Sequence, residues 1–402
     1  MSGATADPRL AAARAVPKKR MRLSWSDPAL RGIVWQVVIV ALVVLGIWWL
    51  VSNTRHNLEV RRIATGFGFL WREAGLPIGE HLIDYSPTDT YFRALLVGVL
   101  NTLRVAIVGI VLATILGTLI GVARLSKNWL LAKLSAVYVE VLRDLPLLLQ
   151  LLFWYAMLQG LPGPRQALHP AEGVYLSNRG LKLPGLVWEP AHGWALAAFL
   201  IGLVATYFYR RSALAKQMAD GRPRPVWPAA LGFLVVLPVA VWAALGAPWT
   251  VDWPALRGFN IQGGLTLSPE YFALLLGLVL YTAAFIAEIV RSGIMAVQLG
   301  QWEAAQALGL RPGQVLRRIV LPQALRVIIP PMTSQYLNLT KNSSLAVAIG
   351  YQDIVSIANT TLNQTGQAIE GVAIIMGVYL TISLSISLFM NWYNKRIALV
   401  ER

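Results

Sequence analysis

Long apolar runs alternate with short polar segments along the 402-residue chain. A helix that crosses a membrane needs about 17–25 mostly apolar residues. Six runs meet this requirement clearly: 32–51, 94–123, 193–209, 228–246, 269–290 and 372–393. Two more, 138–160 and 327–349, are long enough but carry charged or amide side chains. The pattern predicts an all-α membrane protein with about eight transmembrane helices.

The basic residues indicate the side of the membrane on which each loop lies, because cytoplasmic loops carry an excess of Lys and Arg. With the N-terminus inside, the inner segments hold 23 basic residues and the outer segments hold nine. The inner segments are 1–31, 124–133, 210–226, 291–326 and 394–402. We therefore expect both termini in the cytoplasm. The first run is not followed by a small-residue cleavage site, so an uncleaved anchor is expected rather than a signal peptide.

The composition indicates that much of the chain lies in lipid, and it excludes several classes of function. Apolar residues make up 56% of the chain and charged residues 13%. The net charge of +16 falls mostly in loops between apolar runs, which argues against nucleic-acid binding. No cysteine is present, and the four histidines lack ligand spacing, so no metal site is expected. No Gly-Lys dipeptide occurs, which excludes a P-loop, and we expect the chain not to be an enzyme.

Small residues recur every four positions in the second run, at Ala113, Gly117 and Gly121. This spacing places them on one helix face, where another helix can approach closely. Packing against a helix of the same chain is the expected use, and a dimer contact is the alternative.

The loop after the run at 269–290 has an unusual sequence, EAAQALGLRPGQVLRRIVLPQALRVIIPP (303–331). Residues 301–308 are mostly good helix formers, and Gly309 suits the left-handed residue that ends a helix. Arg311-Pro312-Gly313 predicts a turn. A second short helix is expected over 314–320. The result is a helix, a turn and a helix at the membrane surface.

The first short helix of this loop has two features that suit contact with a partner protein. Ala304, Ala305 and Ala307 leave the first helix thin, so its backbone can enter a groove in another protein, and Glu303 suits the helix dipole. An amphipathic helix lying on lipid is the alternative, although it predicts bulky apolar residues on one face. Pro322 is expected to limit the second helix.

The loop also carries a signature: Glu-Ala-Ala, three residues, Gly, nine residues, then Ile-x-Leu-Pro. Seven positions match it in register: Glu303, Ala304, Ala305, Gly309, Ile319, Leu321 and Pro322. The spacing resembles the cytoplasmic loop of ABC-type importer permeases. The resemblance implies that this loop docks into a cleft on a separate ATP-hydrolysing subunit and transmits its movement to the pore. ATP would then bind to that partner, and this chain would hold no cofactor.

Further segments narrow the resemblance to the polar-amino-acid uptake branch of these permeases. They are VLRDLPLLLQLLF (141–153), AEIVRSGI (287–294), GQWEAAQALGL (300–310), LPQALRVIIPP (321–331) and KNSSLAVAIG (341–350). Two positions depart from the branch: Asp144 stands where Gly is usual, and Ser343 replaces Thr but keeps the hydroxyl. The resemblance covers about 94–160 and 269–400, which contain five spans of a MetI-like core.

The enlarged plan resembles the broad-specificity L-amino-acid permeases of Gram-negative bacteria. This resemblance implies a bacterial inner-membrane location and three kinds of protein partner: ABC ATPase subunits, a second homologous permease and a periplasmic amino-acid-binding protein. It also implies a division of the chain. The expected parts are a basic cytoplasmic tail (1–31), an extra span with a periplasmic segment (32–93), the first core part (94–160), an insertion with two spans (161–268) and the second core part (269–402) with its coupling loop (301–325).

Polar residues inside predicted spans are candidates for the substrate path. A lysine at the centre of a membrane helix costs roughly 2.5–3.5 kcal/mol on insertion scales, so it should face a cavity or a partner. The candidates are Asn338, Lys341, Asn342, Ser343 and, in another span, Gln150. Lys341 lies near a substrate carboxylate or a gate in one hypothesis. In the other it forms a structural ion pair or lies near the membrane surface.

Charged residues near the inner ends of spans have a different expected role. Glu140, Arg143 and Glu288 are predicted to form structural pairs or a coupling network rather than to contact substrate. Arg104, in the second span, is left without an assigned role.

The sequence thus predicts the permease subunit of an ATP-driven importer that moves polar or general L-amino acids inward. An importer permease for another small solute is an alternative. An ion-coupled secondary transporter is a second one, but it usually shows two matching halves, and no internal repeat is evident. A membrane scaffold is a third, and it gives no reason for a lysine-bearing span.

Overall fold

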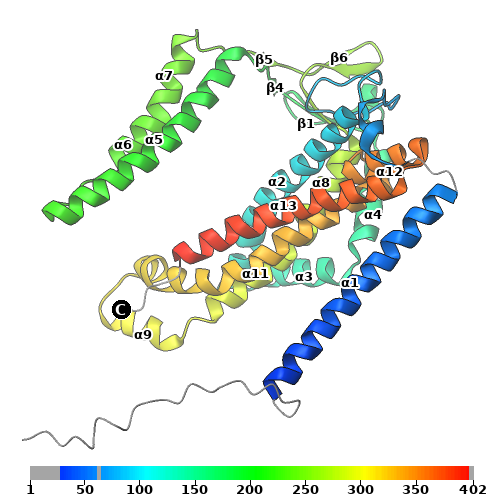
Figure 1. Ribbon diagram of the computed structural model, residues 1–402. Helices are drawn as coiled ribbons and strands as arrows, with labels where there is room; N and C mark the ends of the chain where they lie inside the picture. Colours follow the sequence, from blue (N-terminus) through cyan, green and yellow to red (C-terminus); the bar gives the residue numbers. More distant parts are fainter. Residues whose placement is uncertain (1–27, 61–64, 398–402) are drawn as a thin grey trace, which may run out of the picture. The chain divides into compact units, whose positions relative to one another are not determined.

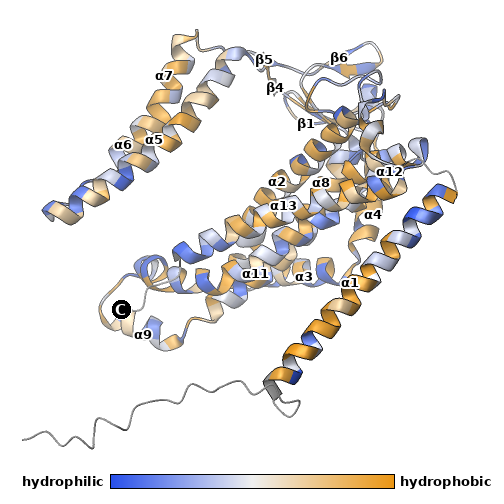
Figure 2. Cartoon of the chain, in the orientation of Figure 1, coloured by the Kyte–Doolittle hydropathy of each residue, from blue (hydrophilic) through white to orange (hydrophobic). Residues whose placement is uncertain are grey.

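The computed structural model describes residues 28–60 and 65–397. The chain divides into two units, 1–66 and 67–402, each described here by itself. The first unit contains one long helix, α1 (Pro28–Val60), which is apolar along most of its length (Figures 1 and 2). The predicted basic tail, 1–31, falls almost entirely outside the described residues.

The second unit begins with a short 3-10 helix, η2 (Phe67–Trp71), and then α2 (Tyr91–Ala123). Thr90 begins α2 because its side chain accepts a hydrogen bond from the backbone N–H of Arg93. Two helices follow, α3 (Trp129–Asp144) and α4 (Leu147–Gln159). The Asn128 side chain caps α3 in the same way, by accepting from the N–H groups of Leu130 and Leu131.

The span predicted at 138–160 is not one continuous helix, because α3 ends and α4 begins inside it. A proline disfavours helical backbone at the residue before it. Leu145, which precedes Pro146, is extended, with φ −87° and ψ 131°. At a rise of about 1.5 Å per residue, the 13 residues of α4 alone are too few to cross a hydrocarbon core of about 30 Å, so a crossing in this part of the chain needs α3 as well.

The insertion contains short strands that the sequence analysis did not predict, and they lie on either side of a helical hairpin. Helix η3 (Pro164–Gln166) comes first. The strands before the hairpin are β1 (Leu168–Ala171), β2 (Val174–Ser177), β3 (Gly180–Leu183) and β4 (Gly185–Leu186). The strands after it are β5 (Val251–Asp252), β6 (Ala255–Arg257), β7 (Asn260–Gln262) and β8 (Leu265–Leu267). They form an antiparallel sheet in the order β1-β2-β3-β8 and the pairs β4-β5 and β6-β7, so the two flanks of the insertion meet.

The hairpin consists of α5 (Pro190–Asp220), α6 (Trp227–Leu231), the π-helical η4 (Gly232–Val236) and α7 (Leu237–Ala244). Gly202 of α5 faces the carbonyl oxygen of Phe233 with no room for a side chain, which explains the close packing of the two arms. Many of the other residues on the two arms are exposed and apolar.

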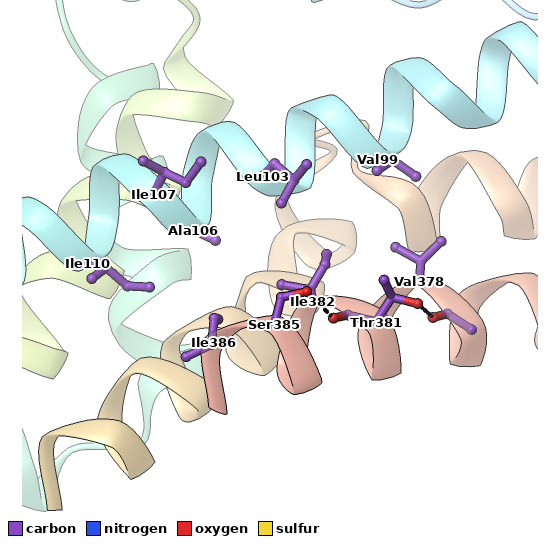
Figure 3. Close-up of a pocket in the computed structure, with 11 residues that line it drawn as sticks. Val99, Leu103, Ala106, Ile107, Ile110, Val378, Thr381, Ile382, Ser385 and Ile386 are labelled. Carbon is purple, nitrogen blue, oxygen red and sulfur yellow. Dashed lines mark hydrogen bonds between the residues drawn. The ribbon is translucent and has the colours of Figure 1, made fainter. Parts of the chain in front are cut away.

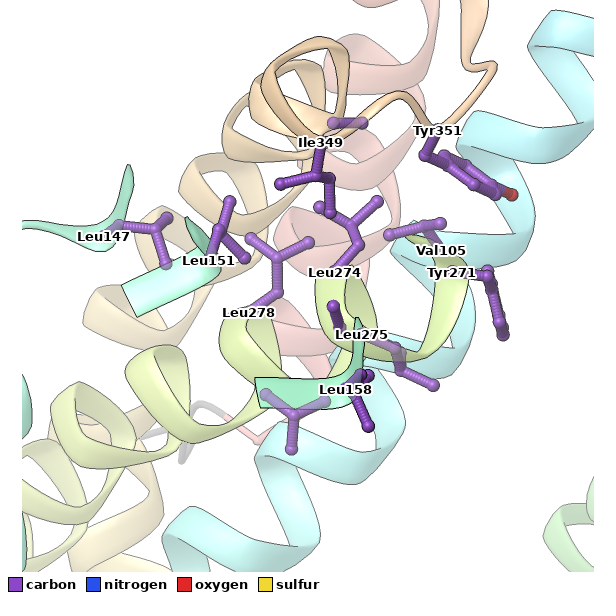
Figure 4. Close-up of a cluster of buried hydrophobic side chains, with 13 residues drawn as sticks. Val105, Leu147, Leu151, Leu158, Tyr271, Leu274, Leu275, Leu278, Ile349 and Tyr351 are labelled. Atoms are coloured by element: carbon purple, nitrogen blue, oxygen red, sulfur yellow. The ribbon is translucent and has the colours of Figure 1, made fainter. Parts of the chain in front are cut away.

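The remainder of the unit is helical. It comprises α8 (Pro269–Met295), α9 (Leu299–Ala307), α10 (Pro312–Val315), η5 (Leu316–Val320), α11 (Leu321–Asn342), η6 (Ser343–Ile349), α12 (Ile354–Thr365) and α13 (Ala368–Ile397). Helix α8 packs against α2, α4 and α11, and α11 packs against α13 (Figure 1). Buried side chains, mostly Leu, Val and Tyr, from α2, α4, α8, η6 and the segment after η6 pack together in one of the core clusters (Figure 4).

Six segments within the described residues are long and apolar enough to cross a membrane: α1, α2, α5, α6–α7, α8 and α13. They coincide with the six clear apolar runs. The predicted span at 327–349 is helical, as α11 and η6, but is too polar to be among them, and Figure 2 shows α11 with mixed colouring. The number of eight spans therefore stays a prediction.

Candidate functional site

The loop between α8 and α11 holds the first part of the candidate site, and a glycine fixes its shape. Gly309 follows α9 with a φ of +73°, where a side chain would be strained. The N–H of Gly309 donates to the carbonyl of Gln306, and the N–H of Leu310 donates to that of Ala305. This pair of bonds is the Schellman arrangement, so the end of α9 is a rigid turn, as the sequence predicted.

One side of the loop packs into its own chain. Ala305, at 1% exposure, joins Val315 and Val320 in a cluster with residues of α8 and α11. Trp302 and Leu310 pack against the same cluster. Burial of these apolar groups holds α9 against the transmembrane bundle, so a displacement of α9 must also disturb α8 and α11.

The opposite side of α9 is exposed. Glu303 and Ala304 lie on it, with Leu299 at 71% and Leu308 at 80% exposure. In the part of the chain that the structure describes, Glu303 makes no ion pair or hydrogen bond. Two leucines exposed beside an unpaired carboxylate form a partly apolar surface that a partner protein or the membrane surface can cover.

The structure therefore divides the seven signature positions into two groups. Ala305 is buried and Ile319 is half-buried, so these two hold the loop to the bundle. Glu303, Ala304, Gly309, Leu321 and Pro322 are exposed. The expectation that Ala305 serves to keep the helix thin for a partner is wrong, because its side chain faces its own chain. Ala304 and Ala307 remain on the open side.

Pro322 does not limit the second helix, contrary to the prediction. Proline is tolerated in the first turn of a helix. The preceding segment, η5, is π-helical: the N–H of Leu321 donates to the carbonyl of Leu316, five residues back. The altered spacing accommodates the missing N–H of Pro322, which occupies the first turn of α11, and the helix continues from Pro312 to Asn342.

The small residues of α2 pack against α8 within the chain, as expected. A Cβ atom on Gly117 would lie 2.7 Å from the Cβ of Ile286, and one on Gly121 would lie 2.7 Å from the carbonyl oxygen of Ala287. Ala113 is fully buried in the same contact. The stripe therefore serves contact between helices of one chain, not a dimer.

An ion-pair network lies at the end of the α2–α8 contact where Gly121 meets Ala287. Glu288 of α8 pairs with Arg124, which follows α2, and with Arg291, whose Nη2 lies 2.5 Å from its Oε1. The structural pairing predicted for Glu288 is present, but its partner Arg124 was not predicted, because it lies 164 residues away. Arg143 lies 5.1 Å from the ring centroid of Phe285, and Glu140 is exposed with no ion pair among the described residues.

The second part of the candidate site is a polar stripe on α11. Pro331, Ser334, Asn338 and Lys341 recur at intervals of three to four residues and are all exposed. No described carboxylate pairs with Lys341, so the alternative of a structural ion pair within the chain receives no support. A stripe of exposed amide and ammonium groups on an otherwise well-packed helix is suited to a partner or a water-filled path.

The other path candidates differ from Asn338 and Lys341. Ser343 is buried, and its hydroxyl donates to the carbonyl of Thr340 at 2.8 Å. Gln150 is also buried, and its Nε2 donates to the carbonyls of Leu142 and Leu145 at 2.9 and 3.0 Å. Gln150 thus satisfies carbonyls left free where α3 ends. Asn342 is half-buried and lies one residue before Ser343.

The end of the bundle where α2 begins contains polar groups to which the sequence analysis gave no role. Arg104 pairs with Glu80 at 2.9 Å and lies over the ring of Tyr271, 4.1 Å from its centroid. The buried Asn101 donates to the backbone carbonyls of Glu80 and Gln352. These contacts join segments that are far apart in the sequence, so no local sequence pattern predicts them.

Asp353 is the other missed group. It is 1% exposed, and its carboxylate accepts from the N–H of Ser356, which caps α12. Burial raises the pKa of Asp353 to about 7, and the Ser356 amide opposes the shift. An aspartate directly before a run of helix-compatible residues is an N-cap pattern that was available in the sequence.

An apolar groove of about 450 Å³ lies between α2 and α13 (Figure 3). Its two hydroxyl groups are satisfied by their own helix: Thr381 donates to the carbonyl of Gly377 and Ser385 to that of Thr381. The groove offers no free polar group to an amino acid, so we do not assign it to the substrate path. Within the described residues, no group of three or more His, Asp or Glu side chains is placed to hold a metal.

Comparison with known proteins agrees with this geometry. Residues 228–399 match the family described as the binding-protein-dependent transport system inner membrane component. The general L-amino acid transport system permease protein AapQ of Rhizobium johnstonii is 51% identical over 95% of this chain and 96% of its own length. The chain belongs to this family of ABC transporter permeases.

Two further relatives extend over almost the whole permease. The permease protein YhdX of Escherichia coli is 52% identical over 94% of the chain and 97% of its own length. The glutamate/glutamine/aspartate/asparagine permease protein BztB of Rhodobacter capsulatus is 44% identical over 96% and 98%. The similarity therefore includes the insertion between α4 and α8. The family is a multi-pass inner-membrane component, not an enzyme, and it implies an ATPase and a binding protein as partners.

Proposed function

We propose that this permease forms part of an ATP-driven importer that carries L-amino acids from the periplasm to the cytoplasm. The exposed face of α9 is the observation that carries the proposal. It presents Leu299, Leu308, Ala304 and an unpaired Glu303 on a helix that is rigidly ended and packed against α8 and α11. The ATPase docks on this face, and closure of the ATPase displaces α9 with the helices beneath it.

The direction of transport follows from the predicted orientation. Both termini and α9 lie in the cytoplasm, and the strands that flank the α5–α7 hairpin lie in the periplasm with the binding protein. The excess of basic residues in the inner segments supports this arrangement.

The substrate path lies along the polar stripe of α11. A single permease leaves Asn338 and Lys341 exposed, so a second, related permease faces them and completes the path. The Lys341 ammonium, placed in the last turn of α11 where the helix dipole favours a cation, attracts the carboxylate common to all amino acids. Recognition of this shared group is consistent with a relative named for general L-amino acid transport.

Reconstitution tests the proposal. The permease is placed in liposomes with its partner permease, ATPase and binding protein, and uptake of radiolabelled L-amino acids is measured with internal ATP or with ion gradients alone. Accumulation that requires ATP and the binding protein is expected. Uptake driven by a proton or sodium gradient without ATP would instead establish a secondary transporter, and ATP-driven uptake of a different solute class would overturn the substrate assignment.

A further inference from the structure

A basic pocket lies between the C-terminal parts of α5 and α13. Its volume is about 530 Å³. The residues that line it are Tyr207, Arg210, Arg211, Leu214 and Arg396. Three of these five carry a positive charge and none carries a negative one. The pocket joins the helical hairpin of the insertion to the last helix of the core, two elements that make few other contacts.

The three guanidinium groups have no anionic partner in the described part of the chain. Arg124 and Arg291, by contrast, both pair with Glu288. Arg396 lies over the ring of Trp392, 4.3 Å from its centroid, a contact that positions the group without neutralising it. Like charges gathered in one pocket repel, and an anion removes that repulsion.

The position of the pocket along the helices identifies the anion. Arg210 and Arg211 directly follow the apolar run of α5, and Arg396 follows that of α13. Tyr207 and Trp392 precede these arginines by one turn, where aromatic side chains occupy the membrane interface. The pocket therefore lies at the depth of lipid headgroups, and arginine binds phosphate through paired N–H groups.

We propose that this pocket binds the phosphate headgroup of one anionic phospholipid. The lipid bridges α5 and α13, and its acyl chains lie along the exposed apolar surface of α5. In this way the lipid fastens the inserted hairpin to the permease core.

The test is native mass spectrometry of the assembled importer in detergent. The complex is titrated with phosphatidylglycerol, with phosphatidylcholine of the same acyl chains, and with inorganic phosphate. Wild type is compared with a variant carrying Arg210→Gln, Arg211→Gln and Arg396→Gln. We expect wild type to prefer phosphatidylglycerol and the variant to lose about fivefold in affinity per arginine.

The matched control removes three charges near the same helix ends but outside the pocket: Lys216→Gln, Arg222→Gln and Lys395→Gln. It should keep the wild-type affinity. If the triple pocket variant does not assemble, Arg396→Gln alone carries the test, with an expected loss of about fivefold. Equal binding of the two lipids, equal losses in the pocket and control variants, or displacement of the lipid by inorganic phosphate would each overturn the proposal.

Discussion

Two regions of the permease core use side chains in opposite ways. Along the α2–α8 contact, glycines and alanines let backbones approach, and Glu288 is paired on both sides. Along the exposed face of α11, Asn338 and Lys341 have no partner in the described chain. The first region is complete within one polypeptide, whereas we propose that another molecule completes the second. The difference separates residues that hold the fold from residues that we propose to act in transport.

The largest effect is expected from filling the α2–α8 contact. Gly117→Val places methyl groups where even a Cβ atom would meet Ile286 at 2.7 Å. Overpacking of this kind costs about 1–3 kcal/mol or more, since the opposing backbone must move. We expect a lower unfolding temperature and loss of assembled complex in size-exclusion chromatography. Gly193→Val, where nothing lies within 4 Å, is the control and should assemble normally.

Removal of the charge on Glu288 tests the packed region a second way. Glu288→Gln leaves Arg124 and Arg291 without a counter-charge. Breaking a fully buried pair costs about 3–5 kcal/mol; because these side chains are 14–28% exposed, we expect about 1–3 kcal/mol. A double-mutant cycle with Arg124→Gln, followed by thermal unfolding, measures the coupling. Additive losses would show that the pair does not stabilise the contact.

The pH dependence of stability tests whether water is excluded from Asp353, which begins α12. The pKa of Asp353 is raised from its ordinary value of 3.8 to about 7 by burial, so folding favours the protonated form. Its contribution to stability is complete below pH 3.8 and is lost as the pH rises through about 7. Wild type should therefore unfold at a higher temperature at pH 5 than at pH 8.

Asp353→Asn supplies the comparison, because an amide keeps the cap on Ser356 but does not titrate. This variant should lose most of the difference between pH 5 and pH 8. An unchanged difference would assign the pH dependence to other groups.

The smallest effect on stability, with a clear effect on transport, is expected at Lys341. Lys341→Met removes the charge from the exposed face of α11 and leaves the packed side untouched. We expect roughly a tenfold fall in amino-acid uptake, equivalent to about 1.4 kcal/mol, with normal assembly. Ser344→Ala, which removes a hydroxyl that donates to the Lys341 carbonyl and leaves the charge of Lys341 in place, is the control. Normal uptake by Lys341→Met would exclude a required role in the path.

The sequence predicted what depends on local pattern. Apolar runs located α2 and α8, and Gly309 located the end of α9. The break at Pro146 was overlooked because the apolar run from Leu145 masked the effect of a proline on its predecessor. The partner of Glu288, the role of Gln150 at the end of α3 and the strands of the insertion depend on contacts between distant segments, which no local pattern contains. The division of α9 into a buried and an exposed face likewise depends on tertiary packing, because the sequence alone does not show that Ala305 is buried.

The most direct test of the account is whether the exposed face of α9 binds the ATPase. Ala304→Trp adds bulk to that face, and Ala219→Trp adds the same bulk to the exposed end of α5. Each variant is purified in mild detergent, and the ATPase that copurifies is quantified together with the unfolding temperature. The account predicts that Ala304→Trp loses the ATPase at unchanged stability while Ala219→Trp retains it. Full retention of the ATPase and of ATP-driven uptake by Ala304→Trp would contradict it.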